Sequence, residues 1–185
     1  NGAFLFGWVG IFVYVAAQTG INSFFINYAV ESAGIDRGYA GLILGFGGMG
    51  LFFAGRMLGS WIMQYIRAER LLAVLALVAA HCSMLVVASP GRVGFTALLI
   101  VYFCESIMFP TIFALALRGL GRRTKIASSL LIMGIVGGAV APVLMGLIAD
   151  HSSMAYGFIV PLVCFFIIAA YGGFVARRSA RAKHR

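Results

Sequence analysis

The sequence predicts an all-α membrane protein with six transmembrane helices. Of its 185 residues, 62% are hydrophobic and only 10% are charged, whereas soluble domains average about 25% charged residues. The hydrophobic residues fall into six runs, each near the ~20 residues that a helix needs to cross a bilayer. The runs lack the alternation of barrel strands, and backbone groups in lipid must be paired internally, so each run is expected to be a helix.

Each predicted helix is bounded by polar or turn-forming residues. The six expected helices are Ala3–Tyr28, Tyr39–Met63, Leu71–Ala88, Val93–Leu117, Ile126–Ile148 and Ala155–Ala176. The five connections are Glu31–Gly38, Arg67–Arg70, Ser89–Gly91, Gly119–Lys125 and Asp150–Ser153. Such short connections leave no room for a soluble domain. We therefore expect one bundle over residues 1–176, followed by a basic tail over residues 177–185.

The distribution of Lys and Arg predicts how the chain crosses the membrane. The second and fourth connections with the adjoining Arg118, together with the tail, carry eleven of these residues, and the other connections with the adjoining Arg92 carry two. Positive charge is enriched in cytoplasmic loops. We therefore expect a multi-pass protein of the inner or plasma membrane with both ends of this segment in the cytoplasm, which agrees with an even number of spans.

Composition and charge placement argue against several other classes of protein. The net charge of +9 comes from short clusters between apolar runs, so no basic, aromatic-lined face for nucleic acid is expected. Cys82, Cys104 and Cys164 lie inside apolar runs, and we expect neither disulfides nor a metal site. A membrane enzyme would need clustered titratable residues at one depth, so no catalytic residue is expected. Because the chain starts at Asn1, directly before an apolar run, we expect that an upstream part is missing.

The first predicted helix carries polar residues on one face. Tyr14, Gln18 and Asn22 follow one another at intervals of four residues, and Asn27 belongs to an adjacent polar strip. A buried amide without a hydrogen-bond partner costs several kcal/mol, on the order of 2–7. This face is therefore expected either to line a wet cavity, where amides can bond sugar hydroxyls, or to make hydrogen bonds between helices.

The fourth predicted helix contains Glu105, the only carboxylate predicted deep within a span. A charged group at the bilayer centre costs roughly 2.5–3.5 kcal/mol, so Glu105 must be neutral, paired or facing water. Tyr102 and Phe109 share its helix face, and Pro110 is expected to break the helix near mid-membrane. The combination indicates a ligand site. The alternative is a structural acid that is capped by Ser106 or by an arginine.

Small residues and one arginine mark the second and fifth predicted helices. Arg56, between Gly55 and Gly59, is expected near the inner membrane face, either paired with a helix C-terminus or an acid, or extended to the interface. Gly137, Gly138 and Pro142 belong to a glycine-rich fifth helix. Small residues let helices approach closely in lipid. Tight packing and sliding during a conformational cycle are both compatible with this pattern.

Several motifs together resemble the fucose permease family, the fucose/glucose/galactose:proton symporter branch of the major facilitator superfamily. In chain order, they are Tyr14-Val-Ala-Ala-Gln18-Thr19, Gly55-Arg56-x-x-Gly59-Ser60-Trp61, Glu105-Ser-Ile-Met-Phe109-Pro110-Thr111, Gly119-Leu-Gly121 with Thr124-Lys125, and Gly137-Gly138 followed by Pro142 and Gly146. The resemblance covers nearly the whole chain. It implies the C-terminal six-helix half of a twelve-helix transporter, built as a 3+3 inverted repeat.

The resemblance also implies a function and a set of site residues. It implies proton-coupled uptake of a monosaccharide by alternating access, with no cofactor beyond the coupling proton. The expected partners are the sugar, the lipid bilayer and the missing N-terminal half. The expected sugar-binding residues are Tyr14, Gln18, Asn22, Asn27, Tyr102, Glu105 and Phe109, and the expected gating or structural residues are Arg56, Pro110, Gly137, Gly138 and Pro142. Efflux of a drug-like or amphiphilic solute by the same fold is the alternative.

Overall fold

The computed structural model describes residues 2–183, and every regular element within that range is a helix. The elements are α1 (Gly2–Glu31), α2 (Arg37–Leu42), η1 (Ile43–Gly48), α3 (Met49–Ile62), α4 (Ala68–Ala88), α5 (Arg92–Glu105), α6 (Met108–Leu117), η2 (Gly121–Arg123), α7 (Thr124–Met133), η3 (Gly134–Val136), α8 (Gly137–His151), α9 (Met154–Gly157) and α10 (Ile159–Lys183).

These elements join into six helices that are long and apolar enough to cross a membrane, within the described residues. Their ranges are Phe4–Glu31, Arg37–Ile62, Ala68–Ala88, Arg92–Leu117, Gly121–His151 and Met154–Arg181. The predicted fold class is confirmed, with ends that differ by a few residues. The fifth helix begins earlier than predicted, because the predicted loop Gly119–Lys125 already contains η2 and the start of α7.

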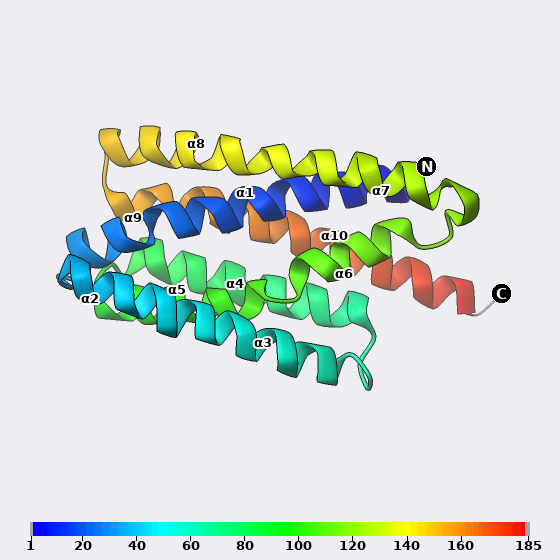
Figure 1. Ribbon diagram of the computed structural model, residues 1–185, viewed down its shortest axis with the longest axis horizontal. Helices are drawn as coiled ribbons and strands as arrows, with labels where there is room; N and C mark the ends of the chain where they lie inside the picture. The colour runs from blue at the N-terminus through cyan, green and yellow to red at the C-terminus, as the bar shows by residue number, and fades with distance from the viewer. Residues whose placement is uncertain (1, 184–185) are drawn as a thin grey trace.

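The six spans run side by side along the long axis of the molecule (Figure 1). The connections α1–α2, α4–α5 and α8–α9 lie at one end, and the connections α3–α4 and α6–α7 lie at the other end together with both chain ends. The basic connections thus gather at the same end as the termini. The helix α10 continues to Lys183, so most of the predicted tail 177–185 is helical, while residues 184–185 lie outside the described range.

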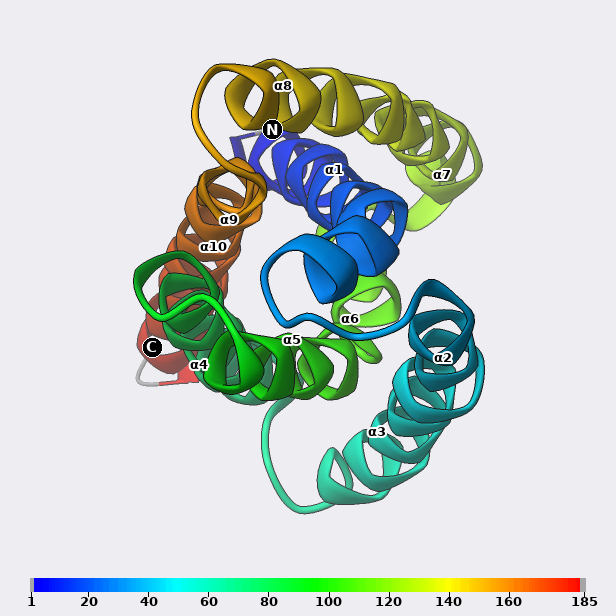
Figure 2. The ribbon, with the colours of Figure 1, turned by 90° about the vertical axis from the view of Figure 1, so that its left-hand side faces the viewer.

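The helix α1 lies at the centre of the bundle and packs against α8, α10 and α6. Figure 2 shows it end-on, with α7 and α8 on one side and α5 and α6 on the other. Its fully buried side chains include Ile11, Ile21 and Phe25, which belong to the same hydrophobic core as the large buried aromatics Phe158 and Phe165. On the polar face predicted for the first helix, Tyr14 is also buried, whereas Gln18, Asn22 and Asn27 are only half-buried.

Two flanks of the bundle are much less covered than α1. The span Arg37–Ile62 and the span Gly121–His151 are the two least buried of the six. Their exposed side chains are mostly large and apolar: Tyr39, Leu42, Phe46, Phe53, Met57 and Trp61 on one flank, and Ile126, Met133, Val136, Val143 and Leu147 on the other. Exposed apolar surface of this extent requires lipid or another protein to cover it.

Local rules account for the turns between the spans. The side chain of Asp36 accepts hydrogen bonds from the backbone N–H groups of Gly38 and Tyr39, which caps the start of α2. Gly34 and Gly91 have positive φ angles of 65° and 118° in the two turns at that end of the bundle, where residues with a Cβ would be strained. These turns fix where the second and fourth spans begin.

Candidate functional site

The polar face of α1 meets α5, the first part of the fourth span. The hydroxyl of Tyr14 donates a hydrogen bond to the main-chain oxygen of Glu105 at 3.1 Å. The hydroxyl of Tyr102 donates to Oδ1 of Asn22 at 2.9 Å. Tyr14 and Asn22, two of the three residues predicted to share a face of this helix, thus bond the same neighbouring helix. For Tyr14 and Asn22, the structure shows the hydrogen bonds between helices that were one of the two alternatives.

The remaining predicted amides keep more access to the surroundings. Gln18 lies on α1 one turn from Tyr14 and one turn from Asn22, and it is half-buried, as Asn27 is. Among residues 2–183, neither side chain has a hydrogen-bond partner within the protein. Their donors and acceptors are therefore available to water or a ligand in this conformation.

The fourth span is interrupted where the sequence predicted a break. The helix α5 ends at Glu105 and α6 begins at Met108. Ser106 tightens the last turn, since both its N–H and its hydroxyl donate to the carbonyl of Phe103, at 3.4 and 2.7 Å. Thr111 resumes regular bonding by donating to the carbonyl of Ile107. The interruption lies near the middle of a span that runs from Arg92 to Leu117.

Arg56 of α3 binds at this interruption. Its Nε and Nη2 groups donate to the main-chain oxygen of Ser106 at 3.2 and 3.0 Å, and its guanidinium lies 5.4 Å from the centre of the Phe52 ring. Ser106 is the residue that follows the last residue of α5. Arg56 therefore pairs with a helix C-terminus, which was one of the predicted alternatives. Its guanidinium lies at the middle of the fourth span and not near the inner membrane face, where the sequence had placed it.

The Glu105 side chain is fully buried, and neither carboxylate oxygen has a hydrogen-bond partner among the described residues. The sequence suggested Ser106 or an arginine as a partner for this carboxyl group. Both are engaged elsewhere, because Ser106 donates to the Phe103 carbonyl and Arg56 donates to the Ser106 carbonyl. An unpaired charge in such surroundings is strongly unfavourable. The geometry therefore suits an uncharged carboxyl group that lacks contact with the outside in this conformation.

Aromatic rings surround the contact between α1 and the fourth span. The Phe109 ring lies 6.0 Å from that of Tyr14, and the Tyr102 ring packs edge-on against Phe25 at 5.6 Å. Phe109 is partly exposed, whereas Tyr14 and Tyr102 are almost fully buried. Seven residues were predicted to bind sugar. Four of them have exposed surface, namely Gln18, Asn22, Asn27 and Phe109, whereas Tyr14, Tyr102 and Glu105 are almost completely buried.

The glycines of the fifth span bring it close to α1. A Cβ on Gly137 would overlap the backbone of Phe12, and a Cβ on Gly138 would overlap the hydroxyl of Thr19. Pro142 lies within α8 and is half-buried. Close packing, as predicted from small residues, therefore explains Gly137 and Gly138, whereas Gly41 and Gly45 of the second span have no neighbour close to such a Cβ.

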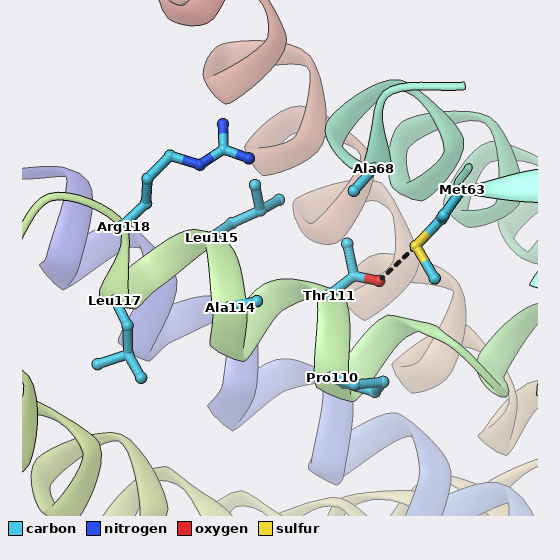
Figure 3. Close-up of a pocket in the computed structure, with 8 residues that line it drawn as sticks. All are labelled: Met63, Ala68, Pro110, Thr111, Ala114, Leu115, Leu117 and Arg118. Carbon is cyan, nitrogen blue, oxygen red and sulfur yellow. Dashed lines mark hydrogen bonds between the residues drawn. The ribbon is translucent and has the colours of Figure 1, made fainter. Parts of the chain in front are cut away.

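A pocket of about 450 Å³ lies beyond the Pro110 break, between the end of α3 and α6 (Figure 3). It is lined by Met63, Ala68, Pro110, Thr111, Ala114, Leu115, Leu117 and Arg118. The hydroxyl of Thr111 points to the sulfur of Met63 across it, at 3.8 Å. Its lining is apolar except near Arg118 and Thr111, and it contains none of the seven residues predicted to bind sugar.

One buried acid was not predicted from the sequence. Glu69, at the start of α4, is 2% exposed and forms an ion pair with Arg67 at 2.6 Å, with Arg118 at 3.9 Å from its other oxygen. The contact joins the start of α4 to the end of α6. Its signal in the sequence was an acid flanked by Arg67 and Arg70, but the predicted third helix began only at Leu71, so Glu69 was assigned to a connection.

Comparisons with known proteins identify related sequences. No protein-family model matches the chain. A glucose/galactose transporter of Brucella abortus is 38% identical over 168 residues, which are 90% of this chain and 40% of that protein. An L-fucose-proton symporter of Escherichia coli is 36% identical over 165 residues, which are 88% of this chain and 37% of that protein. The chain thus spans about two fifths of the length of these relatives.

A solved structure has the same arrangement of helices. The crystal structure of FucP, a major facilitator superfamily transporter in the outward conformation, superposes with a TM-score of 0.91 at 34% sequence identity. The match covers 94% of this chain and 42% of that protein. Sequence and fold therefore agree, and both relate the chain to a part of a longer protein.

Proposed function

We propose that this chain is a relative of the fucose permease family with the fold of the major facilitator superfamily. From this premise, we infer that it forms the C-terminal half of a proton-coupled sugar transporter. The substrate would be a monosaccharide, either fucose or a related hexose such as glucose or galactose. Uptake would occur by alternating access between this half and an N-terminal half of six further helices. The coupling ion would be the proton, with no other cofactor.

The observation that carries the proposal is the exposed Arg56 beside the interrupted span. Its guanidinium binds the Ser106 carbonyl at mid-span, yet the residue as a whole is exposed. A charged group facing lipid at that depth would be strongly unfavourable. This side of the bundle therefore fits a water-filled cavity or the surface of another protein half.

The half-exposed amide of Gln18 supports a sugar as the ligand of that cavity. Amides both donate and accept hydrogen bonds, as sugar hydroxyls do, and Gln18 and Asn27 keep their groups free of partners within the protein. The partly exposed ring of Phe109, which lies 6.0 Å from the Tyr14 ring one turn from Gln18, adds an apolar surface. A few polar groups on an apolar, aromatic wall are typical of small-molecule sites.

The exposed apolar flanks support a partner half and the membrane as the surroundings. The side chains of Phe46, Phe53, Val136 and Val143 are exposed on the two flanks, and a bilayer or an apolar partner would cover them. The basic connections and both chain ends lie at one end of the bundle. By the positive-inside rule, we place that end in the cytoplasm of a cell with the protein in its inner or plasma membrane.

Uptake by the full-length protein tests the proposal. Reconstituted in liposomes, it should accumulate labelled fucose, glucose or galactose when an inward proton gradient is imposed, and a protonophore should abolish the accumulation. The variant Gln18→Ala should raise the sugar dissociation constant about tenfold, since it removes hydrogen bonds to the ligand.

The matched control is Gln64→Ala, in the exposed turn after α3, which should bind sugar normally. No saturable uptake of any of the three sugars would contradict the proposal, and outward transport of an amphiphilic solute by the same protein would favour efflux instead. Equal effects of the two glutamine variants would remove Gln18 from the site.

A further inference from the structure

Pro110 creates a defect in the backbone hydrogen bonding of the fourth span. In a continuous helix the carbonyl of Ser106 would accept from the N–H of residue 110, and proline has none. Glu105 is the last residue of α5, and carbonyls at a helix end lack partners within their own helix. A buried carbonyl left without a donor costs about 1–3 kcal/mol. The junction between α5 and α6 therefore depends on donors from elsewhere.

Two side chains from two other helices supply these donors. Tyr14 of α1 donates its hydroxyl to the Glu105 carbonyl at 3.1 Å. Arg56 of α3 donates two N–H groups to the Ser106 carbonyl, at 3.2 and 3.0 Å. Two consecutive carbonyls at the interruption are thus bonded from two sides of the span.

The backbone of α3 is shaped to reach this junction. A Cβ on Gly55 would overlap the Phe103 carbonyl and the Ser106 hydroxyl, and a Cβ on Gly59 would overlap Ile107. Arg56 lies between these two glycines, so the absence of side chains on either side of it lets α3 lie directly against the interruption. With a larger residue at Gly55, α3 could not lie this close to the Phe103 carbonyl.

We propose that Arg56 is a positioning residue that replaces the N–H group that Pro110 lacks. Together with Tyr14, it holds the α5–α6 junction in one geometry. Tyr102 precedes the junction and Phe109 follows it, so the junction sets how these two rings lie against α1. The role of these rings in a sugar site rests on the proposed function. The support of the junction by Arg56 does not depend on that function.

A double-mutant cycle between Arg56 and Pro110 tests the proposal in the full-length protein. Arg56→Ala should lower the thermal unfolding midpoint and raise the sugar dissociation constant about tenfold, which corresponds to one charged hydrogen bond. Pro110→Ala restores an N–H group that can bond the Ser106 carbonyl. The double variant should therefore lose much less thermal stability and sugar affinity than Arg56→Ala alone. The effects of the two substitutions should be non-additive.

Two further variants keep the cycle interpretable. Arg70→Ala, at an exposed arginine away from the junction, should leave both measurements unchanged. Arg56→Lys retains the charge but offers one donor nitrogen in place of two. Its unfolding midpoint and its sugar dissociation constant should fall between those of the wild type and Arg56→Ala. If Arg56→Ala does not fold, Arg56→Lys with and without Pro110→Ala gives the same comparison.

The outcomes separate this proposal from the proposed function. If Arg56→Ala lowered stability and sugar affinity equally in the wild type and in the Pro110→Ala background, the positioning role would be overturned. Absence of sugar binding by the wild type would instead contradict the proposed function, while the unfolding midpoints would still decide whether Arg56 supports the junction.

Discussion

At the scale of single residues, hydrogen-bond satisfaction separates two kinds of polar group. Tyr14, Tyr102 and Asn22 are bonded between α1 and the fourth span. Glu105 is completely buried, and its carboxylate oxygens lack partners among residues 2–183. Unpartnered buried polar groups are rare in native structures, and a function is a common reason for them. A buried acid at the interruption of the fourth span fits a group that becomes accessible only in another conformation of the proposed transporter.

The variant Glu105→Gln tests this role of the acid. Glutamine has nearly the same shape but cannot take up or release a proton, so we expect sugar exchange across liposome membranes to persist while proton-driven accumulation falls at least about tenfold. Both rates are measured with the same labelled sugar. Glu31→Gln, at the exposed end of α1, is the matched control. Normal proton-driven accumulation by Glu105→Gln would exclude the acid as a proton carrier.

At the scale of elements, glycines decide which helices can touch. Gly137 brings α8 against the backbone of Phe12, and Gly55 brings α3 against the interruption after Phe103. Without a hydrophobic driving force between helices in lipid, such close packing is a main source of association. The contacts of α1 with α8 and of α3 with α5 thus depend on positions that have no side chain.

Gly137→Val should separate α1 from α8. Its side chain would overlap the Phe12 backbone, which cannot move aside as a side chain can, so we expect a loss of about 1–3 kcal/mol in the free energy of unfolding. Thermal unfolding of the purified protein measures this loss of stability. Gly173→Val is the control, because a Cβ at Gly173 meets no atom within 4 Å. Equal stability of the two variants would contradict the close contact.

The elements also show how far the sequence predicts the structure. Hydrophobic run length predicted all six spans, the four-residue intervals from Tyr14 to Asn22 predicted a shared face, and Pro110 predicted the interruption. The partner of Asn22 could not be predicted, since Tyr102 is 80 residues away. The π-helical segment η1 was also missed, because the glycines between Ile43 and Gly48 permit several backbone geometries.

At the scale of the whole molecule, the bundle has a well-packed centre and two sparsely covered flanks. α1 is enclosed by α8, α10 and α6, whereas the spans Arg37–Ile62 and Gly121–His151 expose large apolar side chains. The polar face of α1 and the guanidinium of Arg56 meet consecutive carbonyls of the fourth span. A second half that packs on the open flanks would enclose this polar region in a cavity between the halves.

Accessibility of residue 18 to a water-soluble reagent tests that cavity most directly. In the full-length protein with the native cysteines replaced, Gln18→Cys should react with a membrane-impermeant thiol reagent, and the transported sugar should slow the reaction. Val163→Cys, at an exposed apolar position of α10, should stay unmodified because lipid covers it. An active transporter in which Gln18→Cys is unreactive, or reacts at the same rate with fucose, glucose or galactose present, would contradict a sugar cavity lined by α1.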